Sequence, residues 1–290
     1  FPTPPTGVYF IHLQLGDSYP ATAIVRVDEA GRAAGSDFAR PPRYWAEAAV
    51  LYMVFPREFQ DSDGDGRGDF GGLTARLPYL QALGVNALWL MPVTPGPTSH
   101  GYAATAHFML EEDYGTLADF DTFVTAAHAA GMQVVFDLVA NHTSNRHPFF
   151  AAALANPESP LRALYVFNTD DTYEYAFDFA TLPSLNYNSP VVRGLFLDVV
   201  DFWMDRGVDS IRADIAGFVP PSFWRAVRRR VRGRSDAAML LAELIPPAPG
   251  FFDGEQFDLA YDAHLFWSFK DLFATSGGLD GFDAALDAAE

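Results

Sequence analysis

The sequence predicts an α/β fold, a (β/α)8 barrel of the TIM type with about six of its eight units present. From about Trp45 onward, short apolar runs alternate with amphipathic segments, which is typical of parallel strands joined by helices. Polar residues stand where several runs end, and a barrel carries its functional residues at that end of its strands. The runs interpreted as strands are VLYMVF (50–55), VNALWL (85–90), QVVFDLV (133–139), VDSIRADI (208–215), AMLLAEL (238–244) and FDLAYD (257–262).

The first part of the chain has a different pattern. Residues 1–44 contain GVYFIHLQL and ATAIVRV, in which apolar and polar residues alternate on either side of a Gly-Asp pair. This alternation predicts a β-hairpin. Because two strands cannot bury a face alone, we expect this segment to be the end of a β-sandwich or a strand pair that packs on the next domain.

The barrel is predicted to occupy residues 45–142, to resume at 190–290, and to be incomplete at its C-terminal end. Between these parts, residues 143–189 separate the third strand from the next helix and contain four prolines. A connection of this length is uncommon in a compact domain unless it serves a function. We therefore expect a small excursion domain beside the site.

Composition narrows the classes of partner. The formal net charge of -18 would repel a nucleic acid, and the basic segment 225–234 is interpreted as the solvated face of a helix. No apolar run reaches the roughly 18 residues that a membrane span requires. Residues 1–7 lack the features of a signal peptide, and the chain has no cysteine. We expect no nucleic-acid or membrane partner; cytoplasmic and secreted locations, and the oligomeric state, stay open.

Two acidic residues lie at the C-terminal ends of neighbouring strand candidates. Arg212 and Asp214 are two residues apart and share a face of their strand, and a guanidinium lowers the pKa of a nearby carboxyl. This suits a carboxylate nucleophile; the alternative is a structural ion pair. Glu243 follows an apolar run, which favours a protonated carboxyl and suits a proton donor; the alternative is a glutamate that points to water. Adjacent strands lie ~5 Å apart, close to the carboxyl separation of retaining glycosidases.

Further polar residues end the third strand candidate, in the run FDLVANH. Asp137 is placed to orient Arg212. His142, which follows Asn141, can donate a hydrogen bond to a sugar hydroxyl.

The ordered set DLVANH, GVDSIRAD and LLAE resembles the first three signature regions of the α-amylase superfamily, glycoside hydrolase family thirteen. LPSLN at 182–186, HGY at 100–102 and DSDGDGRGDFGGL at 61–73 resemble further motifs of that family, in the right order. The similarity extends over about residues 45–270.

The resemblance implies a retaining α-glycosidase that acts on α-linked glucans through a covalent glycosyl-enzyme. Asp214 would be the nucleophile and Glu243 the acid/base, with Arg212 poising Asp214. The substrate-binding residues would be Tyr102, His142 and His100, supported by Asp137 and Asn141. Family members that act on chain ends often have aspartate where this chain has Ala103, so we expect an amylase-like or neopullulanase-like enzyme that leans toward internal cleavage. The alternatives are an α-glucan transglycosylase (branching or glucanotransfer) and a non-catalytic carbohydrate- or partner-binding relative.

The loop at 61–69 alternates acidic side chains with glycines, as calcium loops do. In relatives the equivalent loop binds calcium, so the resemblance implies a structural calcium ion held by Asp61, Asp63, Asp65, Asp69 and the carbonyl of Arg67. The alternative is an acidic turn without a metal.

One family motif is absent. The fourth signature region, usually an Asn-His-Asp run after the seventh strand, supplies a third essential carboxylate. No such run follows Glu243 in this sequence. We therefore expect the chain to end before the seventh barrel strand, the third carboxylate to lie beyond residue 290, and the chain alone to be weakly active or inactive.

Overall fold

The computed structural model describes residues 7–13, 21–27, 33–35, 44–245 and 256–274, and the chain divides into two compact units, Phe1–Ala49 and Val50–Glu290. The first unit contains an antiparallel sheet and the short helix α1; its elements are β1 (Gly7–Leu13), β2 (Ala21–Val27), β3 (Ala33–Gly35) and α1 (Tyr44–Glu47). Gly7 pairs with Val27 and Leu13 with Ala21, so the predicted hairpin is confirmed. Its predicted Gly-Asp turn lies outside the described residues.

The second unit is built on a curled parallel sheet in the order β4-β5-β6-β7-β8-β9. Its strands are β4 (Leu51–Val54), β5 (Ala87–Leu90), β6 (Gln133–Leu138), β7 (Ser210–Ala213), β8 (Leu240–Ala242) and β9 (Leu259–Ala260). Each strand lies inside one of the six predicted apolar runs. The inner strands β6, β7 and β8 are almost wholly buried, as expected for a sheet covered by helices. The predicted partial (β/α)8 barrel is confirmed.

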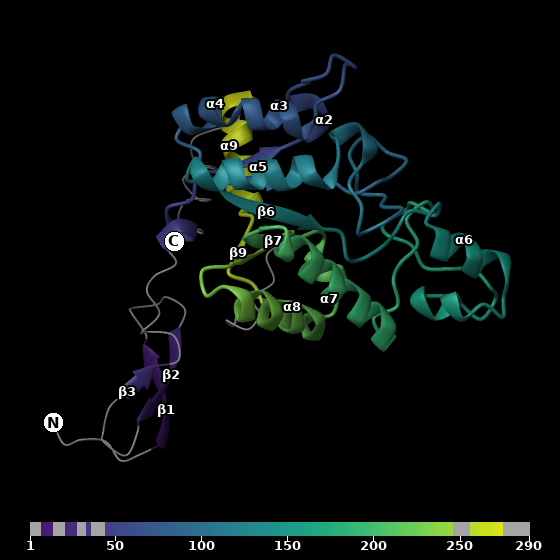
Figure 1. The fold of residues 1–290 in the computed structure, drawn as a ribbon. Helices are drawn as coiled ribbons and strands as arrows, with labels where there is room; N and C mark the ends of the chain where they lie inside the picture. The colour runs from purple at the N-terminus through teal and green to yellow at the C-terminus, as the bar shows by residue number, and fades with distance from the viewer. Residues whose placement is uncertain (1–6, 14–20, 28–32, 36–43, 246–255, 275–290) are drawn as a thin grey trace. The chain divides into compact units, whose positions relative to one another are not determined.

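Helices lie between the strands from β4 to β8 along the chain, and α9 follows β9. They are α2 (Pro56–Phe59), α3 (Phe70–Ala75), α4 (Leu77–Ala82), η1 (Glu112–Tyr114), α5 (Leu117–Ala129), α6 (Pro148–Ala155), η2 (Pro160–Leu164), α7 (Pro190–Asp205), η3 (Ala216–Phe218), α8 (Pro221–Arg234) and α9 (Ala263–Ala274). Figure 1 shows α3, α4 and α5 on one side of β6 and β7, and α7 and α8 on the other. No helix among the described residues is long and apolar enough to cross a bilayer.

The basic run on α8 differs from the solvated helix face that its sequence predicted. Arg228 and Arg232 both contact Asp258, at 2.6 and 3.1 Å, and their side chains are only 12% and 9% exposed. Asp258 also accepts a hydrogen bond from the amide of Leu240 at 2.8 Å. Asp258 neutralises the charge of two arginines of the run. These arginines therefore hold the segment that leads into β9 beside β8.

Residues 143–189 fold beside the end of β6 through short bridges rather than long strands. His142 pairs with Ser184 and Tyr165 with Leu185, so the end of the segment returns to its beginning. Aromatic rings fill its interior: Phe150 contacts Tyr165 and Tyr173, each at 4.9 Å between ring centroids. A small aromatic core thus holds this segment against the carboxyl end of the sheet.

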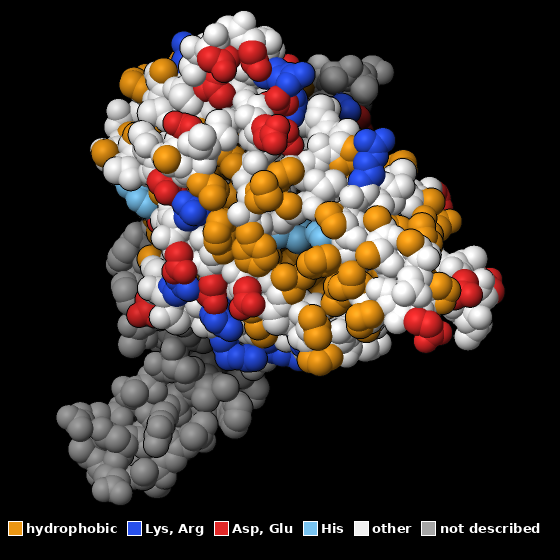
Figure 2. Space-filling model, turned by 45° about the vertical axis from the view of Figure 1, so that its right-hand side comes forward, with side chains coloured by type: hydrophobic (Ala, Val, Ile, Leu, Met, Phe, Trp, Pro, Cys, Tyr) orange, Lys and Arg blue, Asp and Glu red, His pale blue; other side chains and the backbone are white. Residues whose placement is uncertain are grey.

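Figure 2 shows hydrophobic side chains gathered over the middle of one face, with charged side chains of both signs around them. Apolar atoms commonly contribute more than half of a protein surface, so this face alone indicates no partner.

The core between the sheet and its helices is strongly aromatic. Trp203 on α7 is fully buried, stacks on Phe136 of β6 at 4.8 Å and contacts Phe120 of α5 edge-on at 5.1 Å. Its indole Nε1 donates to the carbonyl of His107 at 3.0 Å. Trp203 therefore joins β6 to two helices and to the loop that follows β5.

Because Trp203 fills this position, Trp203→Ala should lower the free energy of unfolding by about 3–5 kcal/mol, the range for large-to-small changes in cores. Val191→Ala on the same helix is the matched control, since Val191 is 62% exposed and its replacement should change stability by less than about 0.5 kcal/mol. Urea unfolding, followed by circular dichroism of the backbone in the far ultraviolet, measures the free energy of unfolding of both variants. Equal losses would contradict this description of the core.

Candidate active site

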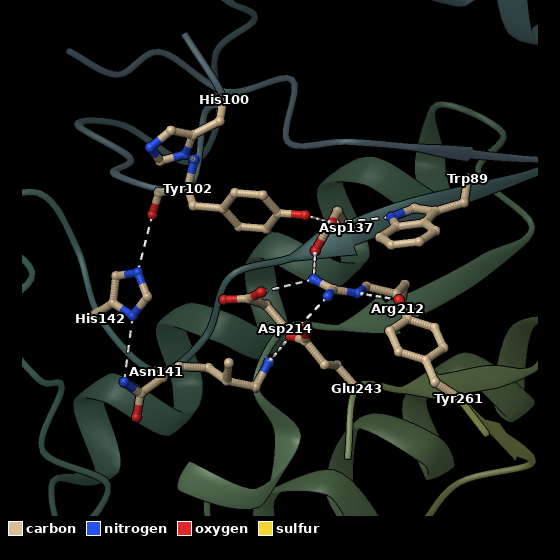
Figure 3. Close-up of polar contacts among 11 residues, drawn as sticks. Trp89, His100, Tyr102, Asp137, Asn141, His142, Arg212, Asp214, Glu243 and Tyr261 are labelled. Atoms are coloured by element: carbon tan, nitrogen blue, oxygen red, sulfur yellow. Dashed lines mark hydrogen bonds and ion pairs between the residues drawn. The ribbon is translucent and has the colours of Figure 1, made fainter. Parts of the chain in front are cut away.

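The polar side chains of the sheet converge where β5 to β9 end. Asp137 on β6 and Arg212 on β7 are direct partners in the strand register, Asp214 comes just after β7, and Glu243 comes just after β8. Parallel strands present their carboxyl ends at the same edge, which is why residues far apart in sequence meet here. Figure 3 shows their side chains directed at one another.

A single guanidinium holds the three acidic side chains. Arg212 is 2% exposed; its NH1 donates to Asp137 Oδ1 at 2.7 Å and to Asp214 Oδ1 at 2.8 Å. Its NH2 contacts Glu243 Oε2 at 2.8 Å. The predicted nucleophile and the predicted acid/base therefore sit on two nitrogens of one planar group, which fixes how their carboxylates face each other.

Asp137 is the most enclosed of the three carboxylates. Besides the Arg212 contact, it accepts hydrogen bonds at Oδ2 from Trp89 Nε1 and Tyr102 Oη, both at 3.0 Å. Its side chain has no exposed surface. With its acceptor positions filled, Asp137 orients Arg212 and Tyr102 rather than facing a ligand.

The charges in this cluster do not balance, because three carboxyl groups share one guanidinium. Burial and then the neighbouring charge of Asp137 raise the pKa of Asp214 to about 8, against the opposing influence of Arg212. Arg212 does lower this pKa, as the sequence predicted, but burial and Asp137 outweigh it and the net shift is upward. The sequence reveals the adjacent cation but neither the burial nor the second carboxylate.

Glu243 does not lie in the apolar surroundings that its sequence predicted. Its side chain is 26% exposed, and its Oε2 accepts a hydrogen bond from the amide of Ile215 at 2.9 Å in addition to the Arg212 contact. Ile215 adopts φ 35 and ψ 53, a left-handed conformation that is unfavourable for a β-branched residue. This turn directs the amide of the residue after Asp214 at the carboxylate of Glu243.

The expected sugar-binding residues form a second group around Tyr102. His142 Nε2 donates to the carbonyl of Tyr102 at 3.1 Å, and Asn141 Nδ2 donates to His142 Nδ1 at 3.3 Å. Burial lowers the pKa of His142 to about 4, so its ring is neutral. Both ring nitrogens are thus engaged by protein, and His142 positions Tyr102 in this structure. His100 is exposed, accepts from the amide of Tyr102 at 3.2 Å and stacks on its ring.

Two site residues were not singled out from the sequence. Tyr261, just after β9, accepts a hydrogen bond from Arg212 Nε at 2.9 Å, and Trp89 on β5 lies with its ring 4.8 Å from the guanidinium carbon. Both are aromatic residues near the end of a strand candidate. An aromatic residue at such a position more often packs in a core than in an active site, so nothing in the sequence indicated their role specifically.

The acidic loop before α3 brings together part of its predicted metal set. Carboxylate oxygens of Asp61, Asp63 and Asp65 lie within 4.8 Å of one another. Asp69 is engaged elsewhere: it caps α3 by accepting from the amide of Gly72 and also accepts from Ser62. The guanidinium of Arg67 pairs with Asp113.

The raised pKa of Asp214 predicts a pH-dependent cost of burying its charge. Between the ordinary value of 3.8 and about 8, the folded state keeps a proton that the unfolded state has lost, so this residue's contribution to stability falls as pH rises. Asp214→Asn removes the titration. Its free energy of unfolding, relative to the wild type, should therefore increase from pH 4 to pH 8.

Urea unfolding at intervals between these pH values measures the difference. Asp236→Asn, at an exposed position, is the matched control. A difference for Asp214→Asn that stays constant, or shrinks as pH rises, would contradict the proposed origin of the shift.

Comparison with known proteins agrees with this geometry. The chain is 36% identical over 262 residues to an α-amylase, MalA, from Haloarcula japonica, covering 90% of this chain and 38% of that protein. It is 34% identical over 203 residues to an oligo-1,6-glucosidase from Parageobacillus thermoglucosidasius, covering 61% of this chain and 36% of the relative. The chain thus spans well under half the length of these curated relatives.

Among solved structures, a cyclic α-maltosyl-(1→6)-maltose hydrolase from Arthrobacter globiformis, in complex with that sugar, superposes with a TM-score of 0.78 at 28% identity. The superposition covers 84% of this chain and 61% of the solved chain. The family model for the α-amylase catalytic domain matches residues 53–245, which include Asp137, Arg212, Asp214 and Glu243. The chain therefore belongs to the α-amylase family, as the ordered motifs of its sequence predicted.

Proposed function

We propose that this chain carries the nucleophile and the acid/base of a retaining α-glycosidase that acts on α-linked glucans. The observation that carries the proposal is the placement of Asp214 and Glu243 on two nitrogens of the buried Arg212 guanidinium, after neighbouring parallel strands. The names of the relatives, which include an α-amylase and an oligo-1,6-glucosidase, support an α-glucan substrate.

In the proposed reaction, an oxygen of Asp214 forms a bond to the anomeric carbon while the bond to the leaving oxygen breaks. Glu243 donates its proton to that oxygen, and the departing sugar leaves as an alcohol. Glu243 then removes a proton from water, whose oxygen displaces Asp214 and regenerates the free carboxylate. If a sugar hydroxyl takes the place of water, the outcome is transglycosylation.

The electrostatics of the cluster place a condition on this cycle. A retaining mechanism needs one ionised and one protonated carboxyl, and the raised pKa of Asp214 retains a proton in the cluster at neutral pH. The mechanism itself requires the proton on Glu243 and the negative charge on Asp214 when the bond breaks. The contact with Arg212 favours the ionised form of Asp214 against the effect of burial.

We also propose that internal bonds of the glucan are cleaved, because Ala103 stands where chain-end-specific members often carry aspartate. The side chain of Ala103 is a methyl group that is only 3% exposed, and it can make no polar contact with the end of a glucan chain. Product analysis with maltoheptaose separates the cases. Shorter mixed products indicate internal hydrolysis, glucose alone indicates chain-end action, and products longer than the substrate indicate transfer.

The nucleophile is tested by trapping with 5-fluoro-α-glucosyl fluoride, which reacts even where turnover is slow. We expect a covalent adduct on the peptide that contains Asp214, observed by mass spectrometry, and none in Asp214→Asn. Glu243→Gln should still be labelled, because fluoride leaves without a proton, yet should lose at least about 100-fold in hydrolysis of an unactivated glucan. Asp236→Asn is the control and should label as the wild type does. An adduct on another residue would refute the assignment of Asp214, and no adduct in the wild type would favour a non-catalytic carbohydrate-binding role.

We further propose that the loop before α3 binds a structural calcium ion through Asp61, Asp63 and Asp65. Calcium prefers several carboxylate and carbonyl oxygens in a flexible arrangement, and these three side chains already converge. Asp69 also caps α3, because its oxygens accept hydrogen bonds from Ser62 and Gly72. The ion would stabilise the loop and take no part in the reaction.

Calcium should therefore raise the unfolding temperature of the wild type, because an ion that binds only the folded state stabilises that state by mass action. Asp65→Ala should abolish that rise, and Asp236→Ala should retain it. Differential scanning fluorimetry with and without calcium chloride measures the shift. The same rise in Asp65→Ala, or no rise in the wild type, would exclude this loop as a calcium site.

A further inference from the structure

Tyr261 completes the contacts of the buried Arg212 guanidinium. Its hydroxyl accepts a hydrogen bond from Arg212 Nε at 2.9 Å, while the two terminal nitrogens contact the three carboxylates of the cluster. Such a partner for Nε is not supplied everywhere, since in the described part of the chain the Nε atoms of Arg57 and Arg206 are buried without one. Because a buried donor without an acceptor is costly, the Tyr261 hydroxyl satisfies a requirement of the site itself.

The sheet brings Tyr261 to this position. Ala242 of β8 pairs with Ala260 of β9, and the next residue on each strand is Glu243 or Tyr261. Asp258, three residues before Tyr261, is held by two arginines of α8. Figure 3 shows the tyrosine hydroxyl directed at the guanidinium. The hydroxyl therefore comes from a segment that the fold anchors independently of the three carboxylates.

The ring of Tyr261 makes contacts that do not need its hydroxyl. The ring centroid lies 5.7 Å from that of Trp89 and 5.8 Å from the guanidinium carbon of Arg212. Tyr261→Phe would keep both of these contacts and remove only the acceptor at Nε. This substitution therefore separates the role of the hydroxyl from that of the ring.

The contact at Nε controls the orientation of the guanidinium plane. A planar group that is held at all three nitrogens cannot turn about one of them without breaking a contact at another. Without the Tyr261 hydroxyl, the buried Nε–H would lose its acceptor, and the plane would turn toward another one. Such a turn changes the distances from NH1 to Asp214 and from NH2 to Glu243 together.

Asp214 is sensitive to this change because its ionisation depends on Arg212. Burial and the charge of Asp137 raise the pKa of Asp214 to about 8, while Arg212 lowers it. The charged and titratable groups that face Asp214 are Asp137, Arg212, Glu243 and Tyr102. Burial raises the pKa of Tyr261, so its hydroxyl stays neutral and adds no charge of its own to the cluster.

We propose that Tyr261 is a positioning residue whose hydroxyl, through Nε of Arg212, keeps the guanidinium in the orientation that favours ionised Asp214. This inference rests on the proposed function, in which Asp214 is the nucleophile. Tyr261 needs no contact with the substrate in this role, because it acts only through the guanidinium. The nucleophile on β7 is thus controlled from β9, two strands away in the sheet.

The test follows adduct formation with 5-fluoro-α-glucosyl fluoride as a function of pH, because this reaction needs ionised Asp214 but no proton from Glu243. In Tyr261→Phe, a weaker contact with Arg212 should raise the pKa of Asp214 further. The pH at which the labelling rate rises should therefore move up by about one unit, which corresponds to about tenfold slower labelling at neutral pH.

Tyr173→Phe is the matched control and should label as the wild type does. It removes a hydroxyl that also makes one hydrogen bond, to the carbonyl of Ala180 at 2.9 Å, in the excursion segment. A loss in Tyr261→Phe that is equal at every pH would refute the effect on ionisation and leave a purely structural role. An unchanged rate and pH profile would overturn the proposal outright.

Urea unfolding gives a readout that does not depend on labelling. A further rise in the pKa of Asp214 costs stability only near and above that pKa, because at lower pH the folded protein keeps the proton in both variants. The loss of stability in Tyr261→Phe should therefore grow from about pH 6 to about pH 9.5. The same substitution made in Asp214→Asn should show no such growth.

The two measurements separate the failure of this inference from the failure of the proposed function. No adduct in the wild type would refute the proposed chemistry, and the unfolding comparison would still decide whether Tyr261 acts on Asp214. An adduct in the wild type, combined with an effect of Tyr261→Phe that does not depend on pH, would refute the inference alone.

Discussion

The arrangement of the site depends on one buried cation. Arg212 donates through NH1 to Asp137 and Asp214, contacts Glu243 through NH2, and donates through Nε to Tyr261. These partners come from four consecutive strands or strand ends, which the backbone pairing of the sheet already places side by side, and the guanidinium fixes how their polar side chains face one another. A lysine could not replace it, because a single ammonium lacks the planar set of donors that reaches partners on several sides. The rings of Trp89 and Tyr261 cover the guanidinium and keep water from it.

The same cation cannot neutralise everything that it holds. Three carboxyl groups surround one positive charge, and two of them are nearly inaccessible to water. The outcome is a raised pKa for Asp214 and hence a proton retained within the cluster. This imbalance costs stability in the absence of substrate and opposes the ionised form that a carboxylate nucleophile needs, a form that the contact with Arg212 favours. The backbone of Ile215 also adopts an unfavourable conformation. The hydrogen bond from its amide to the carboxylate of Glu243 stabilises that conformation.

The contacts outside the site show how the sheet keeps this geometry. Trp203 packs β6 against α5 and α7, and Asp258 is held by two arginines of α8 while it accepts from the amide that begins β8. Both interactions fix strands whose ends carry site residues. Residues 143–189, with their own aromatic core, close against the end of β6 and bring Phe177 to Phe218. The same contacts that stabilise the sheet therefore also position the side chains of the candidate active site.

The sequence by itself determined the order and type of the barrel elements, the family, and the charged residues that meet at the strand ends. Each of these follows from a local pattern: apolar runs bounded by helical segments, or charged residues at fixed spacing such as Arg212 and Asp214. Only the tertiary structure decided the electrostatics and the remaining partners. The net direction of the Asp214 pKa depends on burial and on Asp137, the nitrogens of His142 are engaged by Tyr102 and Asn141, and Asp69 caps a helix. Tyr261 enters the site from a strand 49 residues beyond Arg212. Such properties depend on distances between segments and on the exclusion of water, and neither is written in the order of residues along the chain.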